Sequence, residues 1–211
     1  MYYHCRPLKY VTYGKVFPYK GEDSWLMPCY KWLGNYCGYA PQIWLSRSTS
    51  DITGFRVFNA LKKRKSVISK RSETKIRNDS VLFGFENIKG FPVDYDFWCS
   101  LLNDLMNIKA TNIEEVNKAL IKRLDQSVVW AKKEDYFDED EFSKGWDETR
   151  DLDVFLKKYL FIEKDQVVVP ALNLKSAKKI ICRDERQKKK LRKMGFIEDR
   201  IHIKNLKAWS F

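Results

Sequence analysis

The fold class is set by the stretch QVVVPALNLKSAKKIICRDERQKKKLRKMG, residues 166–195. The β-branched run at its start predicts a strand that ends at a proline, and residues 178–183 predict a second strand. The basic segment that follows predicts a helix closed by Gly195. Residues 200–209 alternate between apolar and polar side chains and predict a last strand.

The rest of the chain adds strands at the N-terminal end and helices in the middle. Residues 2–18 predict two strands separated by a turn, and short apolar runs at 43–46 and 80–85 predict two more. The clearest helix starts after Asn112, which forms a capping-box pattern with Glu115. Its apolar stripe consists of Ile113, Val116, Leu120, Leu124 and Val128. Segments 94–107 and 152–161 predict further helices.

Strands at both ends of a helical middle predict an α+β fold, in which N- and C-terminal strands form a small mixed sheet and the helices are an insertion. A chain of 211 residues is long enough to bury its own core, so we expect one domain over 1–211. The helical segment 86–161 is either part of this domain or a lobe of its own, and the sequence leaves both open.

The charge of the chain is strongly positive and unevenly distributed. Forty Lys and Arg stand against 28 Asp and Glu, for a net charge of +12. Basic residues cluster at 56–77 and 175–193, and acidic residues cluster at 134–153. We expect the two basic clusters to come together on one face, which predicts a partner rich in phosphate, such as nucleic acid, or an acidic protein surface. The residues assigned to nucleic-acid binding are Lys62, Lys63, Arg64, Lys65, Arg71, Arg183, Arg186, Lys189, Lys190 and Lys193.

Each charged cluster has alternative interpretations. The C-terminal basic helix either lies on a phosphate backbone or pairs with the acidic cluster. Residues 62–77 lack an apolar stripe and predict a loop or hairpin arm. The acidic cluster could supply oxygen ligands for Mg²⁺ or Ca²⁺, but its spacing does not fit an EF-hand loop. We therefore expect a solvated turn and no metal there.

Cysteine usage and hydropathy bear on the compartment. The five cysteines have no CxxC spacing, and the chain has two histidines, so neither a zinc site nor a set of disulfides is expected. The N-terminus has no apolar segment typical of a signal peptide, and no apolar run is long enough to span a bilayer. We expect a cytoplasmic protein that does not enter membranes, and the oligomeric state is not predicted.

Three short motifs in separate strands form one constellation: YYHC at 2–5, IWLS at 43–46 and DQVVV at 165–169. In this order they resemble small ADP-ribosyltransferases, particularly the nucleic-acid-modifying and RNA 2′-phosphotransferase-like group. In that family a Tyr-His pair on the first strand binds the nicotinamide ribose of NAD. A Ser-bearing strand packs on the nicotinamide, and a Glu at the head of a late strand stabilises the oxocarbenium ion.

The resemblance implies a role for each matching position. His4 would bind the ribose 2′-hydroxyl, and Tyr3 or Tyr2 would help to form the nicotinamide wall. Ser46 would take the role of the middle strand, with Trp44 beside it. The catalytic position falls on Gln166, where the family has Glu, and a shift in register would bring Asp165 there instead. If Gln166 holds the position, the charge that stabilises a cationic transition state is missing.

Two hypotheses therefore stand. The chain is an ADP-ribosyltransferase-like protein that has a basic face for nucleic acid, either transferring ADP-ribose from NAD or lacking catalysis. Alternatively, it is a non-enzymatic basic protein that binds nucleic acid or a nucleoprotein complex, for example a phage-encoded inhibitor or packaged protein. A metal-dependent nuclease is disfavoured, because the carboxylates lack the spacing of strand-borne metal ligands.

Overall fold

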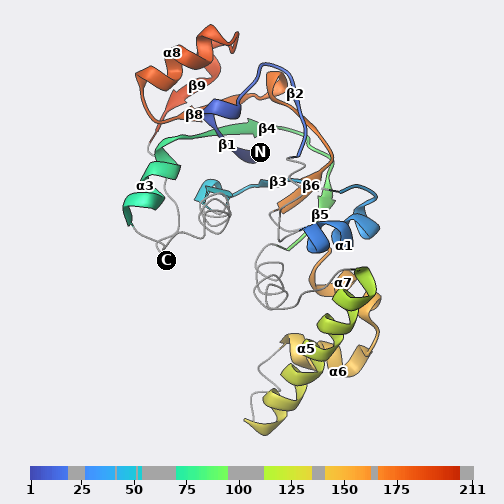
Figure 1. Cartoon of the computed structure of the whole chain (residues 1–211). Helices are drawn as coiled ribbons and strands as arrows, with labels where there is room; N and C mark the ends of the chain where they lie inside the picture. The colour runs from blue at the N-terminus through green and yellow to red at the C-terminus, as the bar shows by residue number, and fades with distance from the viewer. Residues whose placement is uncertain are drawn as a thin grey trace. The chain divides into compact units, whose positions relative to one another are not determined.

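The computed structural model describes residues 1–18, 27–40, 42–50, 52–53, 70–94, 112–134, 141–162 and 166–204, with only the backbone at 27–30 and 70–73. The chain divides into two compact units, each described here by itself (Figure 1). Unit 1 comprises Met1–Tyr19, Ile43–Gly90 and Asp165–Phe211, and unit 2 comprises Lys20–Gln42 and Phe91–Lys164.

Unit 1 is built on a mixed sheet that joins the two ends of the chain. Its strands are β1 (Tyr2–Pro7), β3 (Ile43–Ser46), β4 (Ser80–Phe85), β6 (Gln166–Val169), β8 (Lys179–Cys182) and β9 (Ile201–Ile203). They lie in the order β6-β3-β1-β4-β8-β9, and all pairs are antiparallel except β8–β9. The predicted α+β class, with N- and C-terminal strands in one sheet, is confirmed.

One face of this sheet carries the main hydrophobic core. Alternate strand residues point to the same face, and Phe83, Val167 and Ile180 belong to this core. A two-stranded ribbon of β2 (Lys15–Val16) and β7 (Leu172–Asn173) contributes Val16 and Leu172 to it. The short 3-10 helices of unit 1 are η1 (Leu8–Tyr10), η2 (Leu174–Ser176) and η3 (Glu198–Arg200).

Helix α8 (Glu185–Lys193) packs beside β8 and β9 and is fixed at both ends (Figure 1). Its N-cap Asp184 accepts a hydrogen bond of 2.9 Å from the Gln187 backbone N–H, and Gly195 closes its C-terminal end at a φ of 97°. The buried Gln187 amide also donates to the Asn78 carbonyl over 2.6 Å. This bond ties α8 to the end of α3 (Lys70–Asn78).

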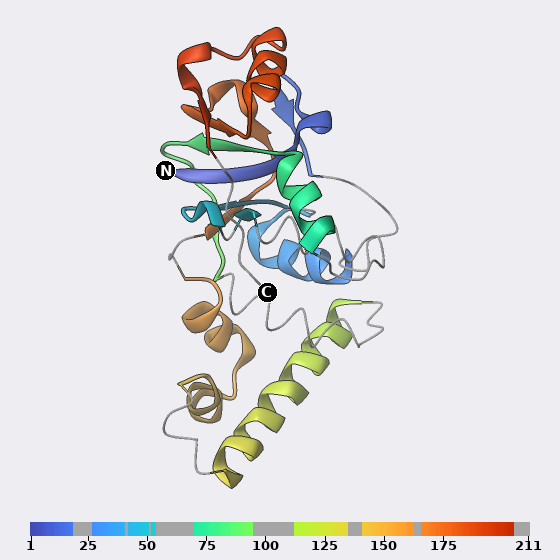
Figure 2. The same ribbon diagram turned by 90° about the vertical axis from the view of Figure 1, so that its left-hand side faces the viewer.

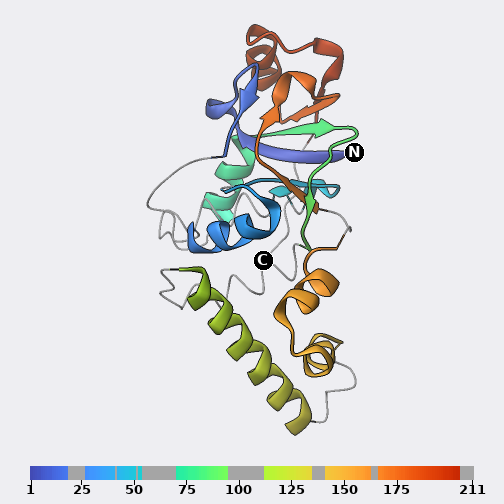
Figure 3. The same cartoon turned by 90° about the vertical axis from the view of Figure 1, so that its right-hand side faces the viewer.

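Unit 2 contains the helices of the middle of the chain, which Figures 2 and 3 show from two sides. Its elements are α1 (Met27–Cys37), the short β5 (Phe91–Pro92), α5 (Ile113–Lys133), α6 (Glu141–Thr149) and α7 (Leu152–Tyr159). The predicted cap of α5 is confirmed, because Asn112 Oδ1 accepts the Glu115 N–H over 2.9 Å. Trp146, Phe155 and Tyr159 pack with the apolar stripe of α5 in one core.

Several local predictions were wrong. Residues 70–78 form a helix and not a loop or hairpin arm, and within the acidic cluster residues 141–149 form α6 and not a turn. A helix forms there because Trp146 is buried, at 2% exposure, against α5 and α7. The last strand is shorter than expected, since β9 ends at Ile203. The helix predicted at 94–107 lies outside the described residues after Asp94.

No helix among the described residues is long and apolar enough to cross a lipid bilayer.

Cys182 provides a test of the packing of unit 1. Its thiol has no exposed surface, and burial raises its pKa to about 11. Because the thiolate is the reactive form, we expect iodoacetamide at a pH of about 8 to modify Cys182 at least about 100-fold more slowly than an unfolded thiol. The half-buried Cys37 serves as the internal reference in a mass-spectrometric time course. Equal rates at the two cysteines would contradict this packing.

Candidate functional site

The three strands that carry the quoted motifs are consecutive neighbours in the sheet of unit 1. β3 lies between β6 and β1. Ser46 is paired with Tyr3 on one side and with Gln166 on the other. Directly opposed residues of neighbouring strands point to the same face, so Tyr3, Ser46 and Gln166 form one row across the sheet. We call these three residues the polar row.

Two polar side chains of this row, Ser46 and Gln166, are buried. Ser46 is 1% exposed and Gln166 is 7% exposed. Ser46 Oγ accepts a hydrogen bond of 3.0 Å from the Ser48 backbone N–H, which fixes the chain as it leaves β3. Among the described residues, the Gln166 side chain makes no hydrogen bond. A buried amide can orient polar groups of a ligand, but it offers no negative charge.

On the other side of Tyr3, the next position of the row is a glycine of β4. Tyr3 is paired with this Gly84, and a Cβ added at Gly84 would lie 2.9 Å from Tyr3 Cε1. The ring therefore lies directly over the Gly84 backbone, and any larger residue at that position would displace it. Beyond Gly84 the row reaches Lys179, which is its partner on β8.

His4 lies on the opposite face of β1 from the polar row. It is paired with Phe83, which belongs to the main core of unit 1. His4 Nδ1 is 3.1 Å from the Trp44 carbonyl oxygen. A carbonyl oxygen only accepts, so Nδ1 carries a proton and donates it in this contact.

The structure thus brings together only some of the residues that the resemblance assigned to NAD. Tyr3, Ser46 and Gln166 share a row, and the buried Trp44 lies two residues before Ser46 on the same face. His4 does not share this face. Period-two alternation along β1 is the signal that could have separated Tyr3 from His4. Asp165 lies outside the described residues.

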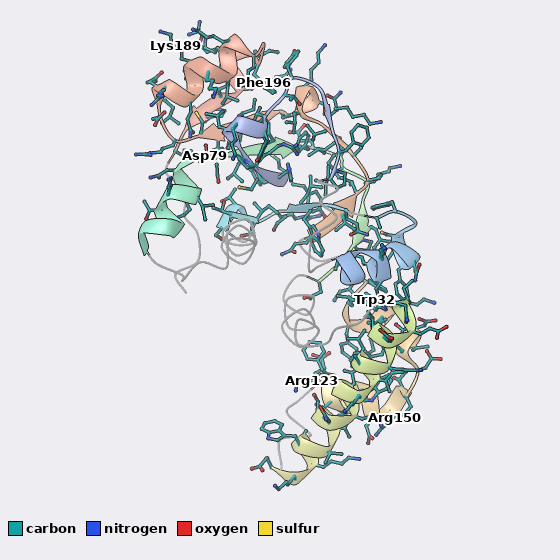
Figure 4. The ribbon with its side chains drawn as sticks, viewed as in Figure 1. Trp32, Asp79, Arg123, Arg150, Lys189 and Phe196 are labelled. Carbon is teal, nitrogen blue, oxygen red and sulfur yellow. The ribbon has the colours of Figure 1, made fainter. Side chains whose placement is uncertain are left out.

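The basic residues of α8 fall into two groups. Lys188 and Arg192 both pair with Glu198, at 3.3 and 3.1 Å. The other group is exposed at i, i+3, i+4 and i+7 spacing, and its members make no ion pair with any residue that the structure describes. It consists of Arg186, Lys189, Lys190 and Lys193, which we call the cationic face of α8. Figure 4 shows Lys189 projecting outward from this helix.

The remaining basic candidates are placed differently. Arg183 is exposed just before α8 and lies 3.9 Å from the Asp184 carboxylate. Arg71 lies in α3, where only the backbone is described. Lys62, Lys63, Arg64 and Lys65 lie outside the described residues. A convergence of both basic clusters on one surface therefore stays a prediction.

Sequence reasoning missed three exposed aromatic rings in the segment 10–17, one of which, Tyr13, lies near the C-terminal end of α8. Tyr10, Tyr13 and Phe17 are 55%, 41% and 57% exposed. Tyr13 packs edge-on against Phe196 at a centroid distance of 5.0 Å, and Phe196 follows α8 closely in the chain. In the sequence, these aromatic residues lie three and four positions apart with lysines beside them. That pattern did not show which of the rings would be buried.

No group of three or more His, Cys, Asp or Glu side chains that could hold a metal occurs among the described residues. Comparison of the chain with protein-family models, with curated proteins and with solved structures found no match.

Proposed function

We propose that the chain is an ADP-ribosyltransferase-like protein that binds nucleic acid through the cationic face of α8. The adjacency of β1, β3 and β6 carries the first half of this proposal, because the resemblance requires that three segments distant in sequence meet. The pairing of Ser46 with both Tyr3 and Gln166 supports it further. The second half rests on four exposed basic side chains that lie on one side of a helix.

In this proposal the chain's own residues position NAD, which is a substrate. Ser46 and Gln166 would offer hydrogen-bonding groups to the nicotinamide end, and the Tyr3 ring would supply an apolar wall. The reaction breaks the bond between nicotinamide and ribose C1′, and a nucleophile of the acceptor forms the new bond to C1′. Nicotinamide leaves neutral, so the site mainly has to orient the ribose and stabilise its positive charge.

A non-enzymatic nucleic-acid-binding protein is the second candidate. It is favoured by the uncharged Gln166, by the burial of Ser46 and by the position of His4 on the other face of β1. In this case the cationic face of α8 would bind phosphate without any transfer reaction, as backbone contacts alone do.

The two candidates are distinguished by NAD titration and by transfer of labelled ADP-ribose. We expect the wild-type chain to bind NAD in a calorimeter. We expect the Gln166→Glu variant to transfer label to nucleic acid at least about 10-fold faster than wild type, because it places an anion where positive charge develops. Ser46→Leu, which removes the hydroxyl and fills the row, serves as the negative control. A chain that binds no NAD in either form would favour the non-enzymatic protein.

A further inference from the structure

We propose that the exposed rings of Tyr10, Tyr13 and Phe17 form a stacking platform for the bases of single-stranded nucleic acid. This inference rests on the nucleic-acid half of the proposed function. We call the three residues the aromatic platform.

The first observation is the number of large rings left in solvent within a short segment. Tyr10 and Phe17 are each more than half exposed, and Tyr13 is 41% exposed. Single exposed apolar residues are ordinary, but three exposed large rings within eight positions of the chain are a concentration that a core alone does not explain. Each ring offers a π-face, which is the group on which nucleobases stack.

The second observation is that each ring has a lysine over it. Lys9 lies 4.7 Å from the Tyr10 centroid, and Lys15 lies 5.2 Å from the Phe17 centroid. Lys175, from η2, lies 5.5 Å from the Tyr13 centroid. Such contacts are weak at exposed sites, so a base can displace the ammonium group, which then remains close enough to contact the neighbouring phosphate. This charge pattern fits an anionic polymer of bases and disfavours an apolar protein partner.

The third observation is that buried residues lie next to the rings in the chain. Leu8, Val11 and Val16 are buried in the core of unit 1. The Gly14 carbonyl accepts the Leu174 N–H over 2.9 Å. A surface that is already ordered loses little entropy when a ligand binds, so the exposed rings are prepared for stacking.

The position of the platform relates it to the cationic face of α8. Tyr13 contacts Phe196, whose ring also packs on Phe83 of β4 at a centroid distance of 5.6 Å. A Cβ added at Gly195 would lie 3.5 Å from Tyr13 Cδ1, so Tyr13 lies near the C-terminal end of α8, where Lys193 is the last helical residue. In duplex nucleic acid the bases are stacked inside and unavailable, so the platform favours single strands.

The test compares labelled oligothymidine with a labelled duplex of the same length, by fluorescence anisotropy on the full chain. We expect the double variant Tyr10→Ala/Phe17→Ala to lose about 10-fold or more in affinity for oligothymidine. Its affinity for the duplex and the salt dependence of binding should stay unchanged, because no phosphate contact is removed. Tyr10→Leu/Phe17→Leu should show the same loss, since leucine keeps apolar surface but has no π-face.

The half-exposed Ile197, which lies in the same unit, provides the control variant Ile197→Ala. Any of three results would overturn the proposed platform. The alanine double variant could keep its affinity for oligothymidine, it could lose equal affinity for both probes, or the leucine double variant could bind oligothymidine as tightly as wild type does. If the platform proposal is wrong but α8 binds nucleic acid, charge reversal on the cationic face of α8 still weakens the binding of both probes. A wild-type chain that binds neither probe overturns the platform together with the nucleic-acid half of the proposed function, whereas NAD binding is measured separately.

Discussion

Replacing Trp146 by alanine is expected to unfold most of the helical core of unit 2. The side chain is 2% exposed and lies among Leu124, Val128, Phe155 and Tyr159. Its indole N–H donates to Asp125 Oδ1 over 2.8 Å, which links α6 to α5. Truncation of a buried Trp costs about 3–5 kcal/mol, which is a large part of the stability of an ordinary domain.

Hydrogen exchange followed by mass spectrometry measures this loss for each unit separately, which is needed because a chain of two units need not unfold in one step. Peptides from α5, α6 and α7 should exchange much faster in Trp146→Ala, while peptides from the sheet of unit 1 should change little. Trp130→Ala is the matched control, because Trp130 lies on α5 and is 53% exposed. We expect it to cost less than about 1 kcal/mol. Similar exchange in both variants would contradict the assigned core.

Elements with strong local signals were predictable. The cap at Asn112 and the stripe of α5 follow from periodicity, and β6 ends at Val169, next to a proline. In α3 and α6 the apolar signal is weak because each helix carries few large apolar side chains. Ile76 is the buried hydrophobic residue among the α3 side chains that the structure describes, and the large apolar residues of α6 are Phe142 and Trp146. Such helices form because tertiary packing outweighs a weak local pattern.

The candidate site was predictable only in part, because its geometry depends on how strands pair. The strand positions of Tyr3, Ser46 and Gln166 came from local patterns, but their register depends on contacts between residues far apart in the chain. Local propensity does not determine which strands become neighbours. The ion pairs of Glu198 with Lys188 and Arg192 were likewise not predictable, because Glu198 belongs to the separate 3-10 helix η3 that follows α8. They show that only part of the basic helix remains for a partner.

Charge reversal on the cationic face of α8 should therefore weaken nucleic-acid binding more than the same change elsewhere. We expect Lys189→Glu/Lys193→Glu to lower affinity for duplex and single strand by on the order of 100-fold at moderate ionic strength, since contacts are lost and repulsion is added. The matched control is Lys118→Glu/Lys122→Glu on α5. It alters two exposed lysines at the same spacing and changes the net charge equally.

The salt dependence of binding decides between local contact and general attraction. If Lys189 and Lys193 each contact a phosphate, their reversal lowers the slope of log K against log salt by about 2, whereas the α5 variant leaves that slope unchanged. Equal losses of affinity in the two variants would mean that the net charge of the chain, and not α8, attracts the polymer. A steeper loss in the α8 variant, with folding verified by circular dichroism, would assign the phosphate contacts to this helix, because both variants carry the same total charge.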